Sequence, residues 1–300
     1  MSESVGEIVK SLVANVAIAC AKGVAAALSG SGAMLAETLH SLADCGNQIL
    51  LLVGVRSAKK PPDARHPLGY GRAMYFYSFI VALMLFFGGG VFSIREGIHK
   101  IENPEPVEGI TISLVILAFS FVLEGASLWS NFRAIKPRRG DKSVVRYLRD
   151  TKDSDLIIVF GENSAAVVGL LFAALSLVLA RETGDGRWDG AGSLAIGLVL
   201  VGVAAFLARE VKSLLVGEAA DPAVCRHVEE VAAADPDVER VLNVITIQQG
   251  PGEILVAGKL QFRAGLGTQD LVEVINRFER ALKARAPEVR WSFIEPDDHA

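Results

Sequence analysis

The chain has 300 residues, of which 51% are hydrophobic and 21% are charged, and its mean hydropathy is +0.38. This composition is too apolar for an ordinary soluble domain and too charged for a protein that lies wholly in a membrane. The formal net charge of −4 argues against nucleic acid as a partner, because nucleic acid attracts basic proteins. Long apolar blocks end near residue 210, so the sequence predicts a membrane domain over 1–216 and a smaller domain over 217–300.

Six apolar runs are each long enough for a transmembrane helix, which needs about 20 mostly apolar residues. They are Ile8–Leu28, Ala33–Val55, Tyr75–Ile98, Ile110–Phe132, Leu156–Ala180 and Ala191–Val211. The loops after the second and fourth runs are basic, whereas the loop after the third run is acidic. The positive-inside rule therefore places both termini and the C-terminal domain in the cytoplasm. No cleavage-site pattern follows the first run, so we expect no signal peptide and a bacterial inner membrane as the location.

Short features within these runs predict local structure. The first two runs are separated only by Ser29–Gly32, which predicts a tight helical hairpin. Asp189 stands at the start of the sixth run and is expected to cap that helix, since a carboxylate can accept hydrogen bonds from its first N–H groups. Glycines 88–90 in the third run predict close helix packing or a bend.

The C-terminal segment contains alternating helix and strand patterns. Asp221 and Pro222 resemble a helix N-cap followed by proline at the first helical position. We expect helices over Ala223–Ala234 and Gln269–Ala284, and strands over Val238–Gln248, Ile254–Phe262 and Val289–Ile294. The order αββαβ predicts a ferredoxin-like α+β sandwich, a module that more often pairs or regulates than catalyses.

Two ionisable residues, His40 and Asp44, lie four positions apart inside the second apolar run. On a helix this spacing places both side chains on one face, one turn apart. A carboxylate at the centre of a membrane helix costs about 2.5–3.5 kcal/mol to insert, so we expect Asp44 to have a function that offsets this cost. An imidazole and a carboxylate at this spacing suit a divalent metal such as zinc. A polar pair that joins helices by hydrogen bonds is the alternative, and we favour the metal site.

The fifth run carries Glu162 and Asn163 near its cytoplasmic third, at about the depth of Asp44 in the second run. We therefore expect Glu162 to be a metal ligand, with an interfacial carboxylate that reaches water as the alternative. Asn163 is a poorer ligand for zinc, because an amide offers a dipole rather than a charge.

Other polar groups in or beside the runs are assigned different roles. Glu124 in the fourth run is either a proton acceptor or the partner of Lys22 in the first run, and Glu37 joins it on a possible proton or ion pathway. The segment His66–Arg72 is interpreted as a turn shaped by its glycines and proline rather than as a metal entrance. Cys45 points about 100° away from Asp44 and is assigned to packing.

Three motifs resemble those of the cation diffusion facilitator family of divalent-metal transporters. They cover residues 29–44, 66–72 and 189–194, and with six apolar runs and a ferredoxin-like tail the resemblance spans nearly the whole chain. Residues 44–48 and 162–169 are most similar to the branch that contains the animal mitochondrial zinc exporter. The resemblance implies a homodimer, alternating access and exchange of metal for protons.

The chain departs from the family pattern on the fifth span. Family members usually offer two ligands on the second span and two on the fifth. Alignment on Gly169 puts Asn163 where an aspartate is usual and Val159 where the other ligand would stand. Glu162 is then the available carboxylate of this span.

We therefore expect a secondary transporter that exports a divalent transition metal, Zn²⁺ first, in exchange for protons. Its site would lie on the second and fifth spans and comprise His40, Asp44, Glu162 and Asn163. The alternatives are a transporter of Mn²⁺ or Fe²⁺, or a metal sensor or scaffold that does not transport. No H-E-x-x-H motif is present, so an enzyme is not expected. We expect no resident cofactor, and as partners a second copy of the chain, the lipid membrane, metal ions and protons, without nucleic acid.

Overall fold

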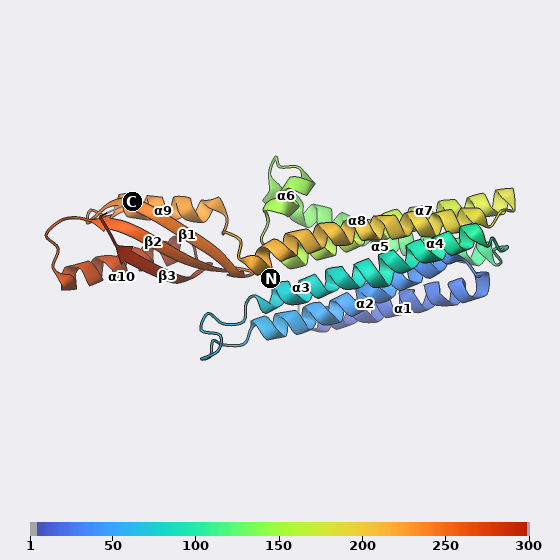
Figure 1. The fold of residues 1–300 in the computed structure, drawn as a ribbon, viewed down its shortest axis with the longest axis horizontal. Coiled ribbons are helices and arrows are strands. Elements are labelled where there is room, and N and C mark those ends of the chain that lie inside the picture. The colour runs from blue at the N-terminus through green and yellow to red at the C-terminus, as the bar shows by residue number, and fades with distance from the viewer. Residues whose placement is uncertain (1–4, 299–300) are drawn as a thin grey trace. The chain divides into compact units, whose positions relative to one another are not determined.

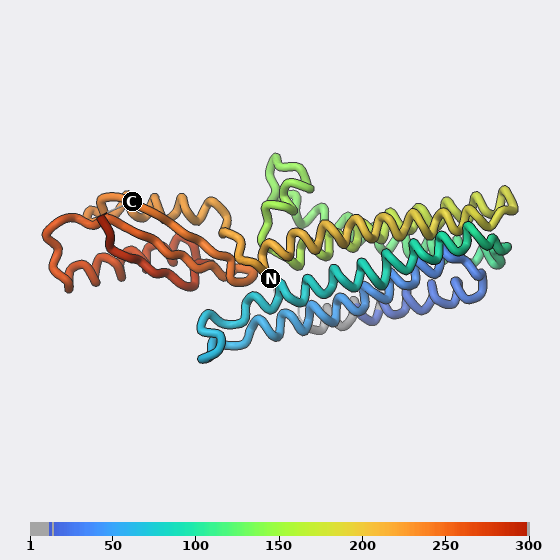
Figure 2. Tube along the Cα trace, in the orientation of Figure 1, coloured from blue at the N-terminus to red at the C-terminus, as the bar shows by residue number. Residues whose placement is uncertain are grey.

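The computed structural model describes residues 5–298 and divides into two compact units. The first unit comprises residues up to 54 together with 77–148 and 155–211. The second unit comprises the C-terminal residues from 212 together with 55–76 and 149–154. The trace in Figure 2 follows the chain from one end to the other.

The first unit consists of long helices that run side by side (Figure 1). They are α1 (Val5–Ser29), α2 (Gly32–Ala58), the continuous run of α3 (Ala73–Met84), the π-helix η1 (Leu85–Val91) and α4 (Phe92–Glu102), then α5 (Ile110–Arg139), the short α6 (Val144–Asp150), α7 (Ser154–Thr183) and α8 (Arg187–Val216). Among the described residues, four stretches are long and apolar enough to cross a membrane: 73–102, 110–139, 154–183 and 187–216. The protein is a helical membrane protein. The helices of the first two predicted spans are present as α1 and α2, and their crossing of the membrane stays a prediction.

The stretch α3–η1–α4 packs closely against α8 through glycines. A Cβ added at Gly97 would lie 2.5 Å from the backbone nitrogen of Leu194, and one added at Gly197 would lie 2.8 Å from the carbonyl oxygen of Gly90. Ser193 Oγ donates a hydrogen bond to the carbonyl oxygen of Ser93 at 2.9 Å. Small residues at these positions let the two backbones approach, and Gly90 lies in the π-helix at the glycine triplet.

Asp189 caps a different helix from the one predicted. Its carboxylate accepts hydrogen bonds from Ser31 Oγ at 2.5 Å, from the backbone nitrogen of Gly32 at 2.6 Å and from that of Ala33 at 3.2 Å. These groups lie at the N-terminus of α2, where free N–H groups and the helix dipole favour a negative charge. The prediction that Asp189 caps its own helix, α8, is wrong, because the buried start of α2 takes the carboxylate instead.

The C-terminal module in the second unit contains a three-stranded sheet. Its elements are α9 (Pro222–Ala234), β1 (Val238–Gly250), β2 (Glu253–Phe262), α10 (Thr268–Arg285) and β3 (Val289–Pro296). The sheet order is β1-β2-β3, with β1 antiparallel and β3 parallel to β2. Val228 of α9 and Phe278 of α10 belong to one core with Val256 of β2. The order αββαβ agrees with the prediction, and the assignment to the ferredoxin-like class stays a prediction.

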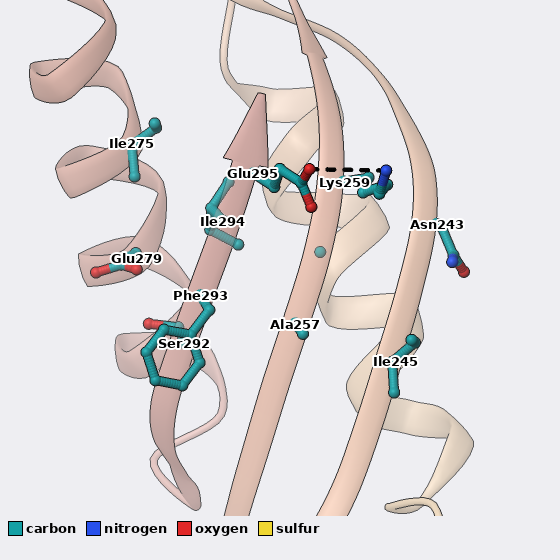
Figure 3. Close-up of a pocket in the computed structure, with 11 residues that line it drawn as sticks. Asn243, Ile245, Ala257, Lys259, Ile275, Glu279, Ser292, Phe293, Ile294 and Glu295 are labelled. Atoms are coloured by element: carbon teal, nitrogen blue, oxygen red, sulfur yellow. Dashed lines mark ion pairs between the residues drawn. The ribbon is translucent and has the colours of Figure 1, made fainter. Parts of the chain in front are cut away.

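The sheet has one face that the helices leave open. On edge strand β3, Ile294 packs against the core of the module, and its neighbour Phe293 lies on the opposite face of the strand. Phe293 is 58% exposed, and Ile245 of β1 is 54% exposed. Lys259 Nζ lies 3.7 Å from Glu295 Oε1 at one end of the same surface (Figure 3). This surface therefore combines exposed apolar side chains with an ion pair.

The loop between α2 and α3 belongs to the same compact unit as the C-terminal module. Asp63 Oδ1 accepts a hydrogen bond from the backbone nitrogen of His66 at 2.7 Å, and Asp63 Oδ2 accepts one from the hydroxyl of Tyr70 at 2.6 Å. The bond from Tyr70 is the main reason that the pKa of Asp63 lies below its usual value. Further along the loop, Gly71 leaves no room for a side chain, because a Cβ there would lie 2.7 Å from the carbonyl oxygen of Gln249. The segment 66–72 thus forms a turn, as predicted.

Candidate metal-binding site

The site is built on one face of α2. His40 is fully buried, and its Nε2 atom lies 3.7 Å from Asp44 Oδ2, one turn further along the helix. Asp44 keeps 17% of its side chain exposed. The two groups therefore share a face, as their spacing predicts, and the carboxylate gives the pair access to the surroundings of the helix.

Asn47 links this face of α2 to Glu162 of α7. Its Nδ2 atom donates a short hydrogen bond to Glu162 Oε1, and both side chains are buried. Asn47 lies seven residues after His40, so it continues the same helical face by one more turn. Asp44 lies three residues before Asn47 on the same face of α2. Helices α2 and α7 thus bring an imidazole, two carboxylates and an amide to one depth.

Several polar atoms of this cluster have no hydrogen-bond partner among the described residues. They are both ring nitrogens of His40, Oδ1 of Asp44 and Oδ1 of Asn47. Buried polar atoms are rarely left unpaired, because each costs about 1–3 kcal/mol. Nitrogen and oxygen atoms of this kind are ligands for borderline and hard divalent cations. The donor set therefore fits a transported divalent metal as substrate.

The arrangement does not close a complete ligand shell. Within the described part of the chain, no group of three His, Cys, Asp or Glu side chains is close enough to hold a metal ion. His40 and Asp44 are together, while Glu162 is held by Asn47. Asn163 is only half-buried, and its side chain makes no hydrogen bond to the described residues. Of the two neighbouring polar residues on α7, Glu162 is the one that reaches the α2 face.

A second buried polar cluster centres on Lys22 of α1. Its Nζ atom donates to Glu37 Oε2 at 3.0 Å, to Ser41 Oγ at 2.9 Å and to Glu124 Oε1 at 3.3 Å. Lys22 and Glu37 are fully buried, and Glu124 keeps 13% of its side chain exposed. The pairing of Lys22 with Glu124, one of the two roles that the sequence left open for Glu124, is therefore present, and Glu37 joins it. One cation facing two carboxylates leaves an excess of one negative charge if all three are ionised.

The Lys22 cluster also borders α7. Glu37 Oε1 is buried without a hydrogen bond among the described residues, and a Cβ added at Gly169 would overlap it. The cluster thus lies where α1, α2, α5 and α7 meet. Glu37 and Ser41 precede Asp44 by seven and three residues on α2, so the cluster is about one helical turn from the His40–Asp44 pair.

Sequence reasoning missed two contributors to these clusters. Asn47 was included only in a motif, although its position three residues after Asp44 places it on the same face. Ser41 had no assignment, because a lone serine in a helix is most often bonded to its own backbone. The helical period identifies the face, but it does not identify the partner on a neighbouring helix.

A bundle of apolar helices around a buried His–Asp pair is an arrangement typical of membrane transport proteins. A sequence profile of the cation efflux transmembrane domain matches residues 8–216 of the chain. The chain therefore belongs to the cation efflux, or cation diffusion facilitator, family, as its motifs predict.

Similar proteins fall near one branch of this family. The mitochondrial proton-coupled zinc antiporter SLC30A9 of Xenopus laevis is 32% identical over 264 residues, which is 85% of this chain and 47% of that protein. The human SLC30A9 is 30% identical over 82% of this chain and 44% of its own length. Metal tolerance protein C4 of Arabidopsis thaliana is 31% identical over 84% of this chain and 56% of its own length.

The chain spans about half the length of these curated relatives. Their names describe metal transport or metal tolerance rather than a catalysed reaction, in agreement with the prediction that the chain is not an enzyme. They are animal mitochondrial and plant proteins, so the predicted bacterial inner membrane has no support from them. The family match supports the coarser part of the predicted location, an integral membrane protein with several spans.

Proposed function

We propose that this chain is a secondary transporter that moves a divalent transition metal, Zn²⁺ first, across a membrane in exchange for protons. The observation that carries the proposal is the buried His40–Asp44 pair, which lies beside Glu162 and has ring nitrogens without hydrogen-bond partners among the described residues. With His40 neutral and two carboxylates ionised, the site charge balances a divalent ion. The zinc antiporters among its relatives support the choice of metal.

The mechanism rests on competition between metal and protons for the same groups. Carboxylate and imidazole must be deprotonated to bind a metal ion, so metal entry releases protons and protonation expels metal. His40 and Asp44 form a half-site on α2, and Glu162 completes it when it leaves Asn47. Rocking of the helices would open this site to each side of the membrane in turn.

The proposal includes six spans, cytoplasmic termini and a homodimer. The basic loops after α2 and α5 support the cytoplasmic side for both termini. The open face of the C-terminal sheet, with Ile245 and Phe293 exposed, supports pairing with a second copy, because exposed apolar side chains favour contact with another protein surface. A ferredoxin-like class for this module belongs to the same proposal.

A non-transporting sensor or scaffold is the second candidate, favoured by the amide at Asn163 and by the incomplete ligand shell. Purified protein in proteoliposomes with an imposed pH gradient separates the two. A transporter accumulates Zn²⁺ and dissipates the gradient when zinc is added, whereas a scaffold does neither. Parallel assays with Mn²⁺ and Fe²⁺ report the preferred metal. Zinc binding without accumulation in either gradient direction would rule the transporter out.

The Lys22 cluster supplies the groups for a proton pathway. Glu37 and Glu124 face one ammonium group, so the cluster is neutral when one of the two carboxylates holds a proton. A neutral cluster avoids the cost of a net charge in a buried position. We assign Glu37 and Glu124 to a pathway that carries the exchanged protons to and from the metal ligands, with Lys22 as the fixed countercharge.

The triple substitution Lys22→Met, Glu37→Gln and Glu124→Gln tests this assignment. It removes all three charges together, so it leaves no unpaired buried charge and is compatible with folding. We expect the variant to bind Zn²⁺ but to stop moving protons when zinc is added to proteoliposomes. The single variant Lys22→Arg, which keeps the countercharge, is the matched control. Normal proton exchange in the triple variant would mean that the cluster is only structural.

A further inference from the structure

We propose that the C-terminal end of α5, together with the turn into α6, binds the headgroups of anionic phospholipids. This basic segment contains six cationic side chains and one carboxylate, that of Asp141, over residues 133–146. The cations are Arg133, Lys136, Arg138, Arg139, Lys142 and Arg146. Its charge is opposite to that of the whole chain, whose net charge is −4.

Four cations of this segment have no acidic partner among the described residues. Arg133, Lys136, Arg138 and Arg146 are exposed, and none of them forms an ion pair with a carboxylate in the part of the chain that the structure describes. Exposed cations at this density repel one another unless an anion lies between them. A phosphodiester supplies that charge, and guanidinium groups can bind it through two parallel hydrogen bonds. The segment therefore has the chemistry of a phosphate-binding surface.

The neighbouring turn of α5 shows which source of phosphate the surface fits. Trp129 is 72% exposed, and it shares a helical face with Arg133 and Lys136, which lie four and seven residues further on. An exposed indole followed by cations is typical of a helix that leaves the hydrocarbon region for the headgroups. Soluble phosphate gives Trp129 nothing to contact, whereas a lipid satisfies both the indole and the cations.

Among the four stretches 73–102, 110–139, 154–183 and 187–216, that of α5 has the largest share of its surface free for lipid. Only 17% of its apolar stretch is buried within the protein, compared with 39–44% for the other three described spans. The side of α5 that faces lipid thus continues directly into the basic segment. The headgroup and the acyl chains of one lipid can therefore contact neighbouring turns of the same helix.

The basic segment is fixed to the helical bundle rather than being a free loop. Leu148 of α6 packs in one apolar cluster with Ile135 of α5 and Phe160 of α7. The ring of Phe132 packs edge-on against that of Phe160, with centroids 4.9 Å apart. The cations are therefore held on a defined backbone, which lowers the entropy cost of binding a headgroup.

The test uses full-length protein and compares phosphatidylglycerol with phosphatidylcholine. Thermal unfolding and Trp fluorescence are followed while short-chain forms of each lipid, or inorganic phosphate, are added to the detergent-solubilised protein. We expect phosphatidylglycerol to bind at least about tenfold more tightly than phosphatidylcholine, with an affinity that falls as salt is raised. Inorganic phosphate at the same concentration should neither stabilise the protein nor displace the lipid.

Three variants decide the location of the binding surface. The triple variant Arg133→Gln, Lys136→Gln and Arg138→Gln should lose the preference for phosphatidylglycerol. The double variant Arg181→Gln and Arg187→Gln, which removes exposed cations at the far ends of α7 and α8, should retain it. Trp129→Ala should weaken binding of both lipids. Equal binding of the two lipids by the wild type, or an unchanged preference in the triple variant, would overturn the proposal, as would displacement of the lipid by inorganic phosphate.

Discussion

Replacement of His40 or Asp44 by alanine is expected to lower Zn²⁺ uptake into proteoliposomes by at least about 100-fold. Loss of a group that only orients a metal ligand already lowers metal affinity or activity by about 10–100-fold, and a ligand itself should matter more. The two side chains lie 3.7 Å apart on one face of α2 and together supply the imidazole and the carboxylate of the half-site. Loss of either leaves one ligand on α2, and that ligand and Glu162 are too few to replace the hydration shell of the ion.

The fold should tolerate both substitutions. Neither ring nitrogen of His40 makes a hydrogen bond among the described residues, so alanine removes packing but no such bond. Cys45→Ala, at a buried position next to Asp44 but on another face of the helix, is the control and should transport normally. Thermal unfolding in detergent checks that the variants remain folded. Wild-type uptake in both His40→Ala and Asp44→Ala would contradict the site.

The second large effect is expected at Glu162. Glu162→Gln keeps the size of the side chain and can still accept the hydrogen bond from Asn47, but it removes the negative charge. A divalent ion in a buried site would then be balanced by Asp44 alone, which leaves one uncompensated charge. We expect uptake to fall by at least about 100-fold, whereas Asn163→Ala should cost less than about tenfold, because an amide contributes only a dipole.

A third substitution distinguishes further between Glu162 and Asn163 as the ligand that α7 provides. Asn163→Asp adds a carboxylate at the half-buried position where the family usually has one, and should not rescue Glu162→Gln if Glu162 alone faces α2. Uptake rates and zinc affinities of the single and double variants measure this directly. The assignment fails if Glu162→Gln transports normally, or if Asn163→Asp restores uptake in its background.

The helical period of the sequence determined the faces on which the functional groups lie. His40 and Asp44 are four residues apart, and on a helix this spacing places both side chains on one face. Their proximity therefore follows without knowledge of any neighbouring helix. The αββαβ order followed in the same way from the helix and strand patterns of residues 221–294. The four long apolar stretches were evident from their length and composition alone.

Only the tertiary structure decided which helices meet, because a helical pattern states what a face carries and not what lies opposite. Glu162 pairs with Asn47 across helices that are far apart in sequence, and Glu37 of the consecutive helix α2 joins the pair of Lys22 and Glu124. Asp189 is another residue whose partner the sequence pattern did not identify. Its position at the start of α8 predicted a local cap, yet the unpaired N–H groups of α2 lie closer to its carboxylate, and buried donors must find an acceptor wherever one is in reach.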